Sequence, residues 1–271
     1  MNNMNSHIRV NQSHDLSGLN SEANNKTCPD GSPEEIRGVI FDLDGTLYQM
    51  KWYFRPVLAL MLMPSSLRLQ HYMSIRKKHM GDDRKSAAAL LDAMASELAR
   101  KTGEGDTMKM LVWIRSKFYP AFERAMNLVR GSRPGLNPML RTLRERGIRL
   151  GVLSDFSRVA QRLRGLGIAP DQFDTLASTE DAGCLKPCPR PLLALAREWG
   201  VPCEKIMVIG DRQDTDGEAA SLAHMHFLRI SDLRVIPEGA YSWTTLKEHL
   251  LTLPGANGSA KHKPSVTNDH S

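Results

Sequence analysis

The stretch that decides the fold runs from Ile36 to Asp42 and reads IRGVIFD, and residues 43–46 continue it as LDGT. A short apolar run that ends in Asp-x-Asp-Gly is typical of a buried strand that passes into a turn. Asp42 and Asp44, two carboxylates separated by one residue just past a strand, can project into the same site. Gly45 permits the sharp turn that lets backbone amides approach an anion. We therefore expect a functional site at the carboxyl end of this strand.

Strand-like and helix-like patterns alternate along most of the remaining chain. Further apolar runs, each bounded by Gly, Asp or Pro, occupy residues 148–154, 206–211 and 226–230. Helical patterns, three of them followed by a glycine, occupy residues 137–146, 157–166, 189–199 and 214–222. This alternation predicts an α/β fold with a Rossmann-like core, in which a parallel sheet has helices on both faces. Ligands of such sheets collect beyond the carboxyl ends of the strands, where Asp42, Ser154 and Asp211 lie.

The segment from residue 51 to residue 131 breaks the alternation. It is rich in Met, Leu, Ala, Lys and Arg and has few strand formers. This composition predicts about four helices, with turns near Pro64, residues 81–83 and residues 102–106. Because the segment is inserted directly after the first strand, we expect it to form an all-α cap over the carboxyl end of that strand.

The other boundaries follow from composition. The core comprises residues 34–50 and 132–253, and the polar, aperiodic ends, residues 1–33 and 254–271, are predicted to be disordered tails. No stretch approaches the roughly 20 apolar residues that cross a bilayer. The N-terminal tail carries no apolar block like that of a secretory signal. We therefore expect no membrane association and a cytoplasmic location.

The positive charge is concentrated around the inserted segment, whose local excess of +9 exceeds the net charge of +6 of the whole chain. From Tyr48 to Arg133 the chain has 16 Lys and Arg against 7 Asp and Glu. A basic insertion attracts anions, although charge alone does not separate a phosphate metabolite from nucleic acid, and a solvated helical face has the same composition. Stacking aromatic residues for single strands and recognisable DNA-reading motifs are both lacking. The sequence therefore argues against nucleic acid as the partner.

The four cysteines are too few and too irregularly spaced for a disulfide framework or a paired C-x-x-C zinc site. We interpret them as reduced thiols that serve packing. Cys184 and Cys188 flank Lys186, which leaves a metal or redox role as the alternative interpretation.

Four short motifs occur in order along the chain. They are Asp42 to Thr46 (DLDGT), Ser154-Asp155, Lys186-Pro187 and residues 210–216 (GDRQDTD). In this order and context they resemble the signature of the haloacid dehalogenase superfamily, whose commonest members are phosphatases. The resemblance covers residues 36–226, and four ordered motifs are far more specific than a lone Asp-x-Asp.

The resemblance implies a role for each acidic residue. Asp42 is the expected nucleophile, and Asp44 is the expected acid that protonates the leaving alcohol and the base that later deprotonates water. The implied cofactor is Mg²⁺, bound by the Asp42 side chain, the backbone carbonyl of Asp44 and Asp211, because oxygen ligands suit this hard ion. Asp216 is expected to support the metal through its waters, with Asp214 as the competing choice.

The resemblance also implies contacts with the phosphoryl group. Ser154 is expected to donate its hydroxyl to a phosphoryl oxygen, and Lys186 to neutralise charge there and to hold the nucleophile's carboxylate. Thr46, through its backbone, and Asp155 complete the expected substrate-binding set.

Together these residues predict a magnesium-dependent phosphatase that hydrolyses a small phosphomonoester through an aspartyl-phosphate on Asp42. Asp44 argues against a dehalogenase, because dehalogenases of this superfamily generally lack the second aspartate. Two alternatives stay open: a phosphomutase, which would keep the same core, and a non-catalytic protein that binds an anion or nucleic acid. The apolar stripes of the cap helices are compatible with either a monomer or a homodimer.

Overall fold

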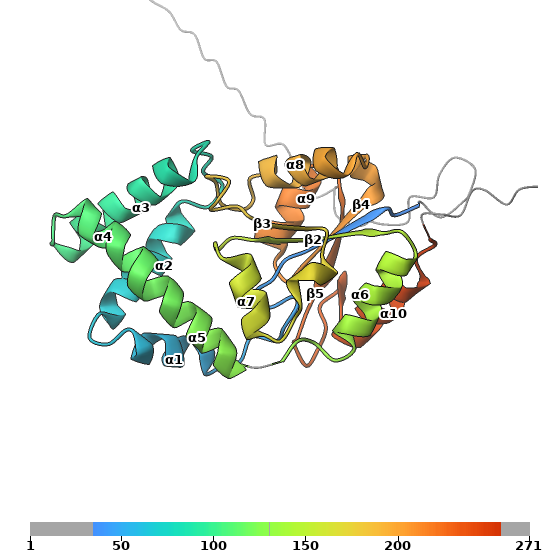
Figure 1. Cartoon of the computed structure of the whole chain (residues 1–271), viewed down its shortest axis with the longest axis horizontal. Helices are drawn as coiled ribbons and strands as arrows, with labels where there is room; N and C mark the ends of the chain where they lie inside the picture. Colours follow the sequence, from blue (N-terminus) through green and yellow to red (C-terminus); the bar gives the residue numbers. More distant parts are fainter. Residues whose placement is uncertain (1–34, 130, 256–271) are drawn as a thin grey trace, which may run out of the picture. The chain divides into compact units, whose positions relative to one another are not determined.

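The computed structural model describes residues 35–129 and 131–255 (Figure 1). These residues form a six-stranded sheet in the order β3-β2-β1-β4-β5-β6, and every pairing is parallel. The strands are β1 (Gly38–Phe41), β2 (Arg149–Ser154), β3 (Thr175–Ser178), β4 (Ile206–Gly210), β5 (His226–Ile230) and β6 (Ala240–Tyr241). The predicted Rossmann-like parallel sheet is confirmed. The two tails predicted to be disordered lie outside the described residues, apart from Pro254 and Gly255.

Strand β1 lies between β2 and β4, and all four of its residues are buried. Because helices cover both faces of a parallel sheet, a central strand is apolar throughout instead of alternating. The register aligns Phe41 with Val152 of β2 and with Ile209 of β4. The three strands therefore end close together, and Asp42 and Asp211, which follow β1 and β4, share one edge of the sheet.

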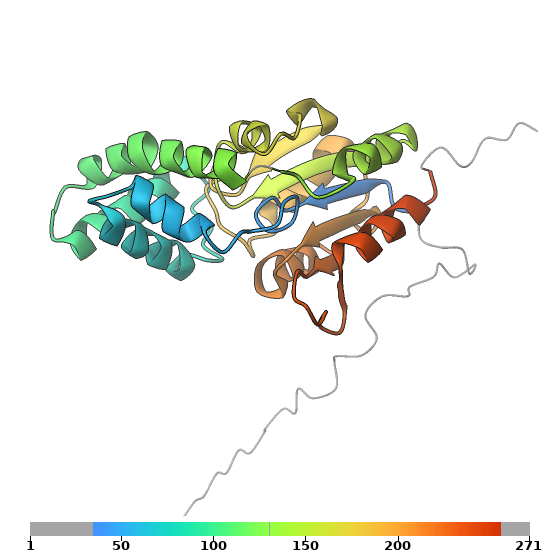
Figure 2. The ribbon, with the colours of Figure 1, turned by 90° about the horizontal axis from the view of Figure 1, so that it is seen from below.

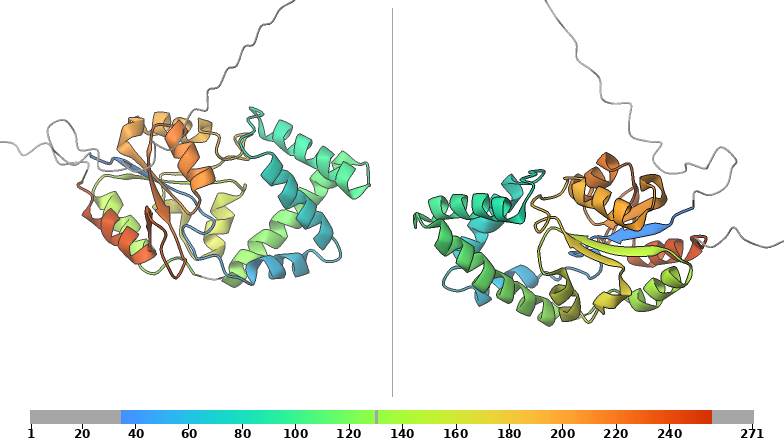
Figure 3. Two further views of the ribbon diagram at one scale, coloured as in Figure 1. Left: turned by 180° about the vertical axis from the view of Figure 1, so that it is seen from behind. Right: turned by 45° about the horizontal axis from the view of Figure 1, so that its top comes forward.

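Helices cover both faces of this sheet (Figure 3). They are α6 (Leu136–Glu145), α7 (Val159–Gly165), α8 (Arg190–Trp199), α9 (Glu218–Leu222) and α10 (Trp243–Thr252). Val39 and Phe41 of β1 belong to a hydrophobic cluster with α6, α7 and α10, whereas Ile40 belongs to a second cluster with α8 and α9. Successive strand residues point to opposite faces, so one short apolar strand supports both layers.

A group of helices between β1 and β2 lies beside the sheet (Figures 1 and 2). Its elements are α1 (Phe54–Met61), α2 (Ser66–Lys78), α3 (Ala87–Thr102), α4 (Thr107–Trp113), the π-helical turn η1 (Ile114–Phe118) and α5 (Tyr119–Val129). The breaks between helices fall near the predicted turns, and the left-handed Gly103 (φ 71°) ends α3. The insertion is all-helical, as predicted, and its limits as a separate domain, residues 51–131, remain a prediction.

Some elements were not predicted from the sequence. Strand β3 reads TLAS and β6 reads AY, so neither carries an apolar run. Both lie at the edges of the sheet, where pairing with a neighbour decides the conformation more than intrinsic preference does. Short turns of 3₁₀ or π helix complete the fold: η2 (Pro170–Gln172), η3 (Cys203–Lys205) and η4 (Gln213–Gly217). No helix in the described ranges combines the length and apolar character needed to span a bilayer.

Candidate active site

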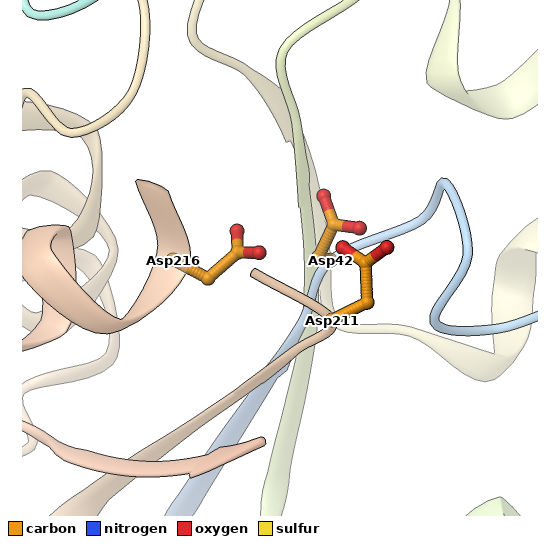
Figure 4. Close-up of side chains that lie close together, drawn as sticks. All are labelled: Asp42, Asp211 and Asp216. Atoms are coloured by element: carbon orange, nitrogen blue, oxygen red, sulfur yellow. The ribbon is translucent and has the colours of Figure 1, made fainter. Parts of the chain in front are cut away.

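Three carboxylates converge at the carboxyl edge of the sheet (Figure 4). Asp42 follows β1, Asp211 follows β4, and Asp216 lies in η4. One carboxylate oxygen from each residue lies within 4.8 Å of the others. Asp42 and Asp216 are buried, and Asp211 is half-buried. The structure thus brings together three of the predicted metal residues, and their oxygen atoms are of the kind that Mg²⁺ prefers.

Gly45 leaves the space that this cluster needs. Its φ of +86° is strained for any residue with a side chain, and a Cβ there would lie 2.6 Å from Asp211 Oδ2. Glycine is therefore required at this position both by the backbone and by the neighbouring carboxylate.

Lys186 pairs with two of the three clustered carboxylates. Its ammonium donates hydrogen bonds to Asp42 Oδ1 (2.6 Å), Asp216 Oδ1 (2.7 Å) and the backbone carbonyl of Leu153 (2.8 Å). Burial pulls the pKa of Lys186 down, but Asp216 and Asp42 outweigh burial, and the pKa lies above its ordinary value. The lysine is therefore a permanent cation beside the predicted nucleophile.

The three carboxylates repel one another. Burial raises the pKa of Asp42 well above its ordinary value; Lys186 opposes this shift, and the other carboxylates add to it. Burial, followed by the charge of Asp216, raises the pKa of Asp211 to about 6. A bound divalent cation would offset this repulsion, so the donor set fits the metal that the sequence predicts.

Asp44 is held by three side chains. Arg162 Nη2 contacts both carboxylate oxygens, Tyr48 donates a 2.9 Å hydrogen bond to Oδ1, and Ser154 Oγ donates a 3.3 Å hydrogen bond to Oδ2. Arg162 was not among the predicted site residues. The signal that could have found it is its place on α7, three residues after buried Val159 and therefore on the apolar face.

The remaining predicted substrate residues lie at the same edge of the sheet. Thr46 Oγ1 donates to Asp42 Oδ2 (3.2 Å). Asp155 Oδ1 accepts hydrogen bonds from Thr179 Oγ1 (2.7 Å) and from the backbone N–H of Lys186 (3.0 Å). Asp155 thus fixes the backbone of the lysine. The substrate contacts of Thr46 and Asp155 remain predictions.

Asp214 lies outside the carboxylate cluster. Its side chain is 64% exposed and forms an ion pair with Arg212 (2.5 Å), which lowers the pKa of Asp214. The Asp216 side chain is 3% exposed and bonds to Lys186. Of the two candidates for the metal-supporting residue, only Asp216 faces the cluster.

Another buried ion pair joins helix α2 to the loop after β3. Arg76 contacts Glu180, and the two side chains are 6% and 1% exposed. Arg76 Nη2 also donates to the backbone carbonyl of Asp155 (2.7 Å), while Tyr119 and Ser157 donate hydroxyl hydrogen bonds to Glu180. The inserted helices are therefore bound to the loops that follow β2 and β3.

Cys184 and Cys188 are both buried and free. Burial and a hydrogen bond with Cys188 raise the pKa of Cys184 to about 12, so it is a thiol at neutral pH. Among the described residues, 35–129 and 131–255, the side chains grouped closely enough to hold a metal ion are Asp42, Asp211 and Asp216. No cysteine belongs to this group. These observations agree with a packing role.

Comparison with known sequences identifies the family. The sequence model of the haloacid dehalogenase-like hydrolases matches residues 36–224, a range that includes the site residues from Asp42 to Asp216. The chain belongs to the haloacid dehalogenase-like hydrolases. The family predicted from the sequence motifs is confirmed.

Individual relatives of the hydrolase match over shorter stretches. Glyceraldehyde 3-phosphate phosphatase of Methanopyrus kandleri is 36% identical over 99 residues, which are 36% of this chain and 42% of the relative. Haloacid dehalogenase-like hydrolase domain-containing protein 3 of Mus musculus is 29% identical over 118 residues, 43% of this chain and 46% of the relative. The chain thus spans less than half the length of these curated relatives.

Solved structures share the fold of this hydrolase. The 2-haloacid dehalogenase of Pseudomonas syringae pv. tomato aligns with a TM-score of 0.52 at 22% identity, covering 80% of this chain and 98% of the other. CbbY of Rhodobacter sphaeroides, in complex with phosphate, aligns with a TM-score of 0.52 at 19% identity, covering 76% and 92%. At these identities the likeness concerns the fold alone.

Proposed function

We propose that this hydrolase is a magnesium-dependent phosphatase that transfers a phosphoryl group to Asp42 and then hydrolyses the aspartyl-phosphate. The observation that carries the proposal is that the Asp42 carboxylate accepts a 2.6 Å hydrogen bond from the Lys186 ammonium and also clusters with the carboxylates of Asp211 and Asp216. A carboxylate attacks phosphorus only where cations offset its repulsion by the phosphoryl oxygens.

The Asp42 carboxylate, the backbone carbonyl of Asp44 and the Asp211 carboxylate would hold Mg²⁺, with Asp216 supporting it. When bound, the ion supplies positive charge to the phosphoryl oxygens and to the attacking carboxylate. Lys186 supplies a second, permanent charge at the same place, and Ser154 supplies a hydroxyl donor.

The acid and base steps fall to Asp44. An oxygen of Asp42 forms a bond to phosphorus, the bond from phosphorus to the leaving oxygen breaks, and that oxygen takes the proton of Asp44. Water then attacks the aspartyl-phosphate and gives a proton to Asp44, which releases inorganic phosphate and free Asp42. Asp42 and Asp44 thus begin and end each cycle in the same protonation state, and Asp42 is free of phosphate again.

We infer that the substrate is a small phosphorylated metabolite in the cytoplasm. One relative is named for glyceraldehyde 3-phosphate, a compound of that class. The helical insertion, joined to the core by the buried Arg76–Glu180 pair, would restrict access for a whole phosphoprotein or a nucleic acid.

The decisive experiment measures phosphate release from a panel of phosphate esters with and without Mg²⁺, using the wild type and Asp42→Asn. We expect magnesium-dependent turnover in the wild type and loss of at least about a thousandfold in the variant. Acid-quenched wild type should carry a phosphoryl group on the peptide that contains Asp42. Phosphate transfer between sugar positions without release would indicate a phosphomutase, and binding without turnover would indicate the non-catalytic alternative.

A further inference from the structure

The Arg162 guanidinium is fully buried and fixed on several sides. Nη1 donates to the backbone carbonyl of Phe156 (3.2 Å), Nε lies 3.4 Å from Met126 Sδ, and the guanidinium stacks over the Phe122 ring at 4.7 Å from its centroid. A buried charge persists only when it is paired, and the partner of Arg162 is Asp44. The fold, not solvent, therefore sets the position of this cation.

The same guanidinium holds two residues of the proposed phosphoryl-transfer site. Nη2 contacts both oxygens of Asp44, and Nη1 donates a 2.8 Å hydrogen bond to Ser154 Oγ. The two nitrogens of one rigid, planar group thus fix Asp44 and Ser154 relative to each other, which a single ammonium would not do. Because Phe122 and Met126 belong to α5, Arg162 also contacts the helical insertion.

We propose that Arg162 is a positioning residue that orients Asp44 for proton transfer to the leaving group, an inference that rests on the proposed phosphatase function. In the reactive state Asp44 carries a proton. When the bond from phosphorus to the leaving oxygen breaks, its electron pair stays on that oxygen, which accepts this proton, and Asp44 is left as the carboxylate that Arg162 contacts on both oxygens. A misplacement of about 1 Å in a group of this kind costs about a hundredfold in rate. Arg162 limits such misplacement because its own position is fixed by Phe156, Phe122 and Ser154.

The nature of the leaving group separates this role from a merely structural one. A primary alkoxide departs poorly without a proton, whereas p-nitrophenolate is stable as the anion and departs without one. The value of kcat/KM includes only the steps up to phosphoryl transfer, so the later hydrolysis of the aspartyl-phosphate does not enter. Arg162 should therefore matter for alkyl phosphates and much less for p-nitrophenyl phosphate.

The test compares kcat/KM for glycerol 3-phosphate and p-nitrophenyl phosphate, at saturating Mg²⁺, in the wild type, Arg162→Met and Arg162→Lys. For Arg162→Met we expect a loss of about a hundredfold with the alkyl ester and a smaller loss, at most about tenfold, with the aryl ester, because only the part that acts through Ser154 is common to both esters. Arg162→Lys, which keeps the charge but has one nitrogen in place of the two that contact Asp44 and Ser154, should lose about tenfold with the alkyl ester.

The matched control is Arg158→Met. Arg158 directly precedes α7, and its guanidinium pairs with Glu123 of α5 at 2.9 Å instead of with Asp44. Both esters should keep kcat/KM within about threefold in this variant, because an exposed pair of this kind contributes little.

Equal losses with the two esters, or a gain with the alkyl ester, would overturn the proposal. So would wild-type turnover of p-nitrophenyl phosphate with none of any alkyl phosphate in a panel of sugar and glycerol phosphates. If Arg162→Met shows no cooperative thermal transition, the comparison is made with Arg162→Lys. Equal losses of kcat/KM with the two esters in that variant would overturn the proposal. Absence of magnesium-dependent turnover in the wild type, or full turnover in Asp42→Asn, would instead refute the phosphatase function itself.

Discussion

Lys186 Nζ lies 2.6 Å from Asp42 Oδ1, although 144 positions separate the two residues in sequence. The pair forms because the loop before α8 and the end of β1 meet at one edge of the sheet. A cation at this distance can both orient the nucleophile and stabilise the charge that develops on a transferring phosphoryl group.

Replacement of Lys186 by Met should reduce kcat/KM by about a hundredfold or more, since one lost electrostatic donor of this type costs about 3 kcal/mol. The measurement is magnesium-dependent phosphate release at several substrate concentrations. Lys205→Met is the control, because Lys205 pairs with Glu35 at 3.7 Å, away from the carboxylate cluster, and the variant should change kcat/KM by less than about twofold. Comparable losses in the two variants would contradict the assigned role of Lys186.

Mg²⁺ should raise the thermal stability of the wild type, because a ligand that binds only the folded state stabilises that state. At a ligand concentration of about a hundred times Kd, the free energy of unfolding rises by about 2.7 kcal/mol. Asp211→Asn should lose most of this increase, and Asp214→Asn should keep it, because Asp214 points away from the cluster toward Arg212. Differential scanning fluorimetry with EDTA and with Mg²⁺ checks this. Loss of the increase in Asp214→Asn, with Asp216→Asn unaffected, would favour the competing metal residue.

In the metal-free protein, Asp211 should lower the free energy of unfolding by an amount that depends on pH. Folding raises its pKa from 3.8 to about 6, chiefly through burial. Between these values the folded state binds more protons, so the stability contributed by this group is greatest below pH 3.8 and is lost as the pH rises through about 6.

Removal of this group should therefore stabilise the metal-free protein. In EDTA, the gain in unfolding free energy of Asp211→Asn over the wild type should grow from about pH 4 to pH 6 and level off above about pH 7. Urea unfolding at fixed pH values measures this difference. The gain should be missing in Asp214→Asn, because Arg212 lowers the pKa of Asp214. A gain for Asp211→Asn that shrinks as the pH rises would be inconsistent with the buried carboxylate cluster.

The parts of the site that the sequence revealed are those with a local pattern. Strands β1, β2 and β4 combine an apolar run with a polar residue at the end, so the strands themselves and the shared edge of Asp42, Ser154 and Asp211 could be predicted. Strand β3, with the residues TLAS, has no such pattern. Arg162 had only a weak signal, because its role depends on the distance to Asp44, and that distance is a product of tertiary packing.

The Arg76–Glu180 pair also depends on tertiary packing and could not be predicted from a local sequence pattern. Its burial predicts a large effect on the free energy of unfolding. Arg76→Met should reduce the free energy of unfolding by about 3–5 kcal/mol, because it leaves a buried carboxylate without its cation. The double variant Arg76→Met with Glu180→Met should be more stable than Arg76→Met alone. Arg37→Met is the control: Arg37 and Glu35 are 44% and 29% exposed, and the loss should stay below about 1 kcal/mol. Urea unfolding distinguishes these outcomes.

Gly45 offers a test that separates backbone strain from intrusion into the site. Gly45→Ala places a Cβ 2.6 Å from Asp211 Oδ2 at a φ of +86°, whereas Gly167→Ala has a similar φ of +73° with nothing within 4 Å. Both variants should lose about 1–2 kcal/mol of stability, since an L side chain is disfavoured in this region. Only Gly45→Ala should also lose the stabilisation by Mg²⁺ and at least about tenfold in kcat/KM, because Asp211 must move to accommodate the methyl group. If Gly45→Ala kept both the stabilisation by Mg²⁺ and the wild-type kcat/KM, Asp211 could move without loss of function. The close approach of the DLDGT turn to Asp211 would then not be needed for activity.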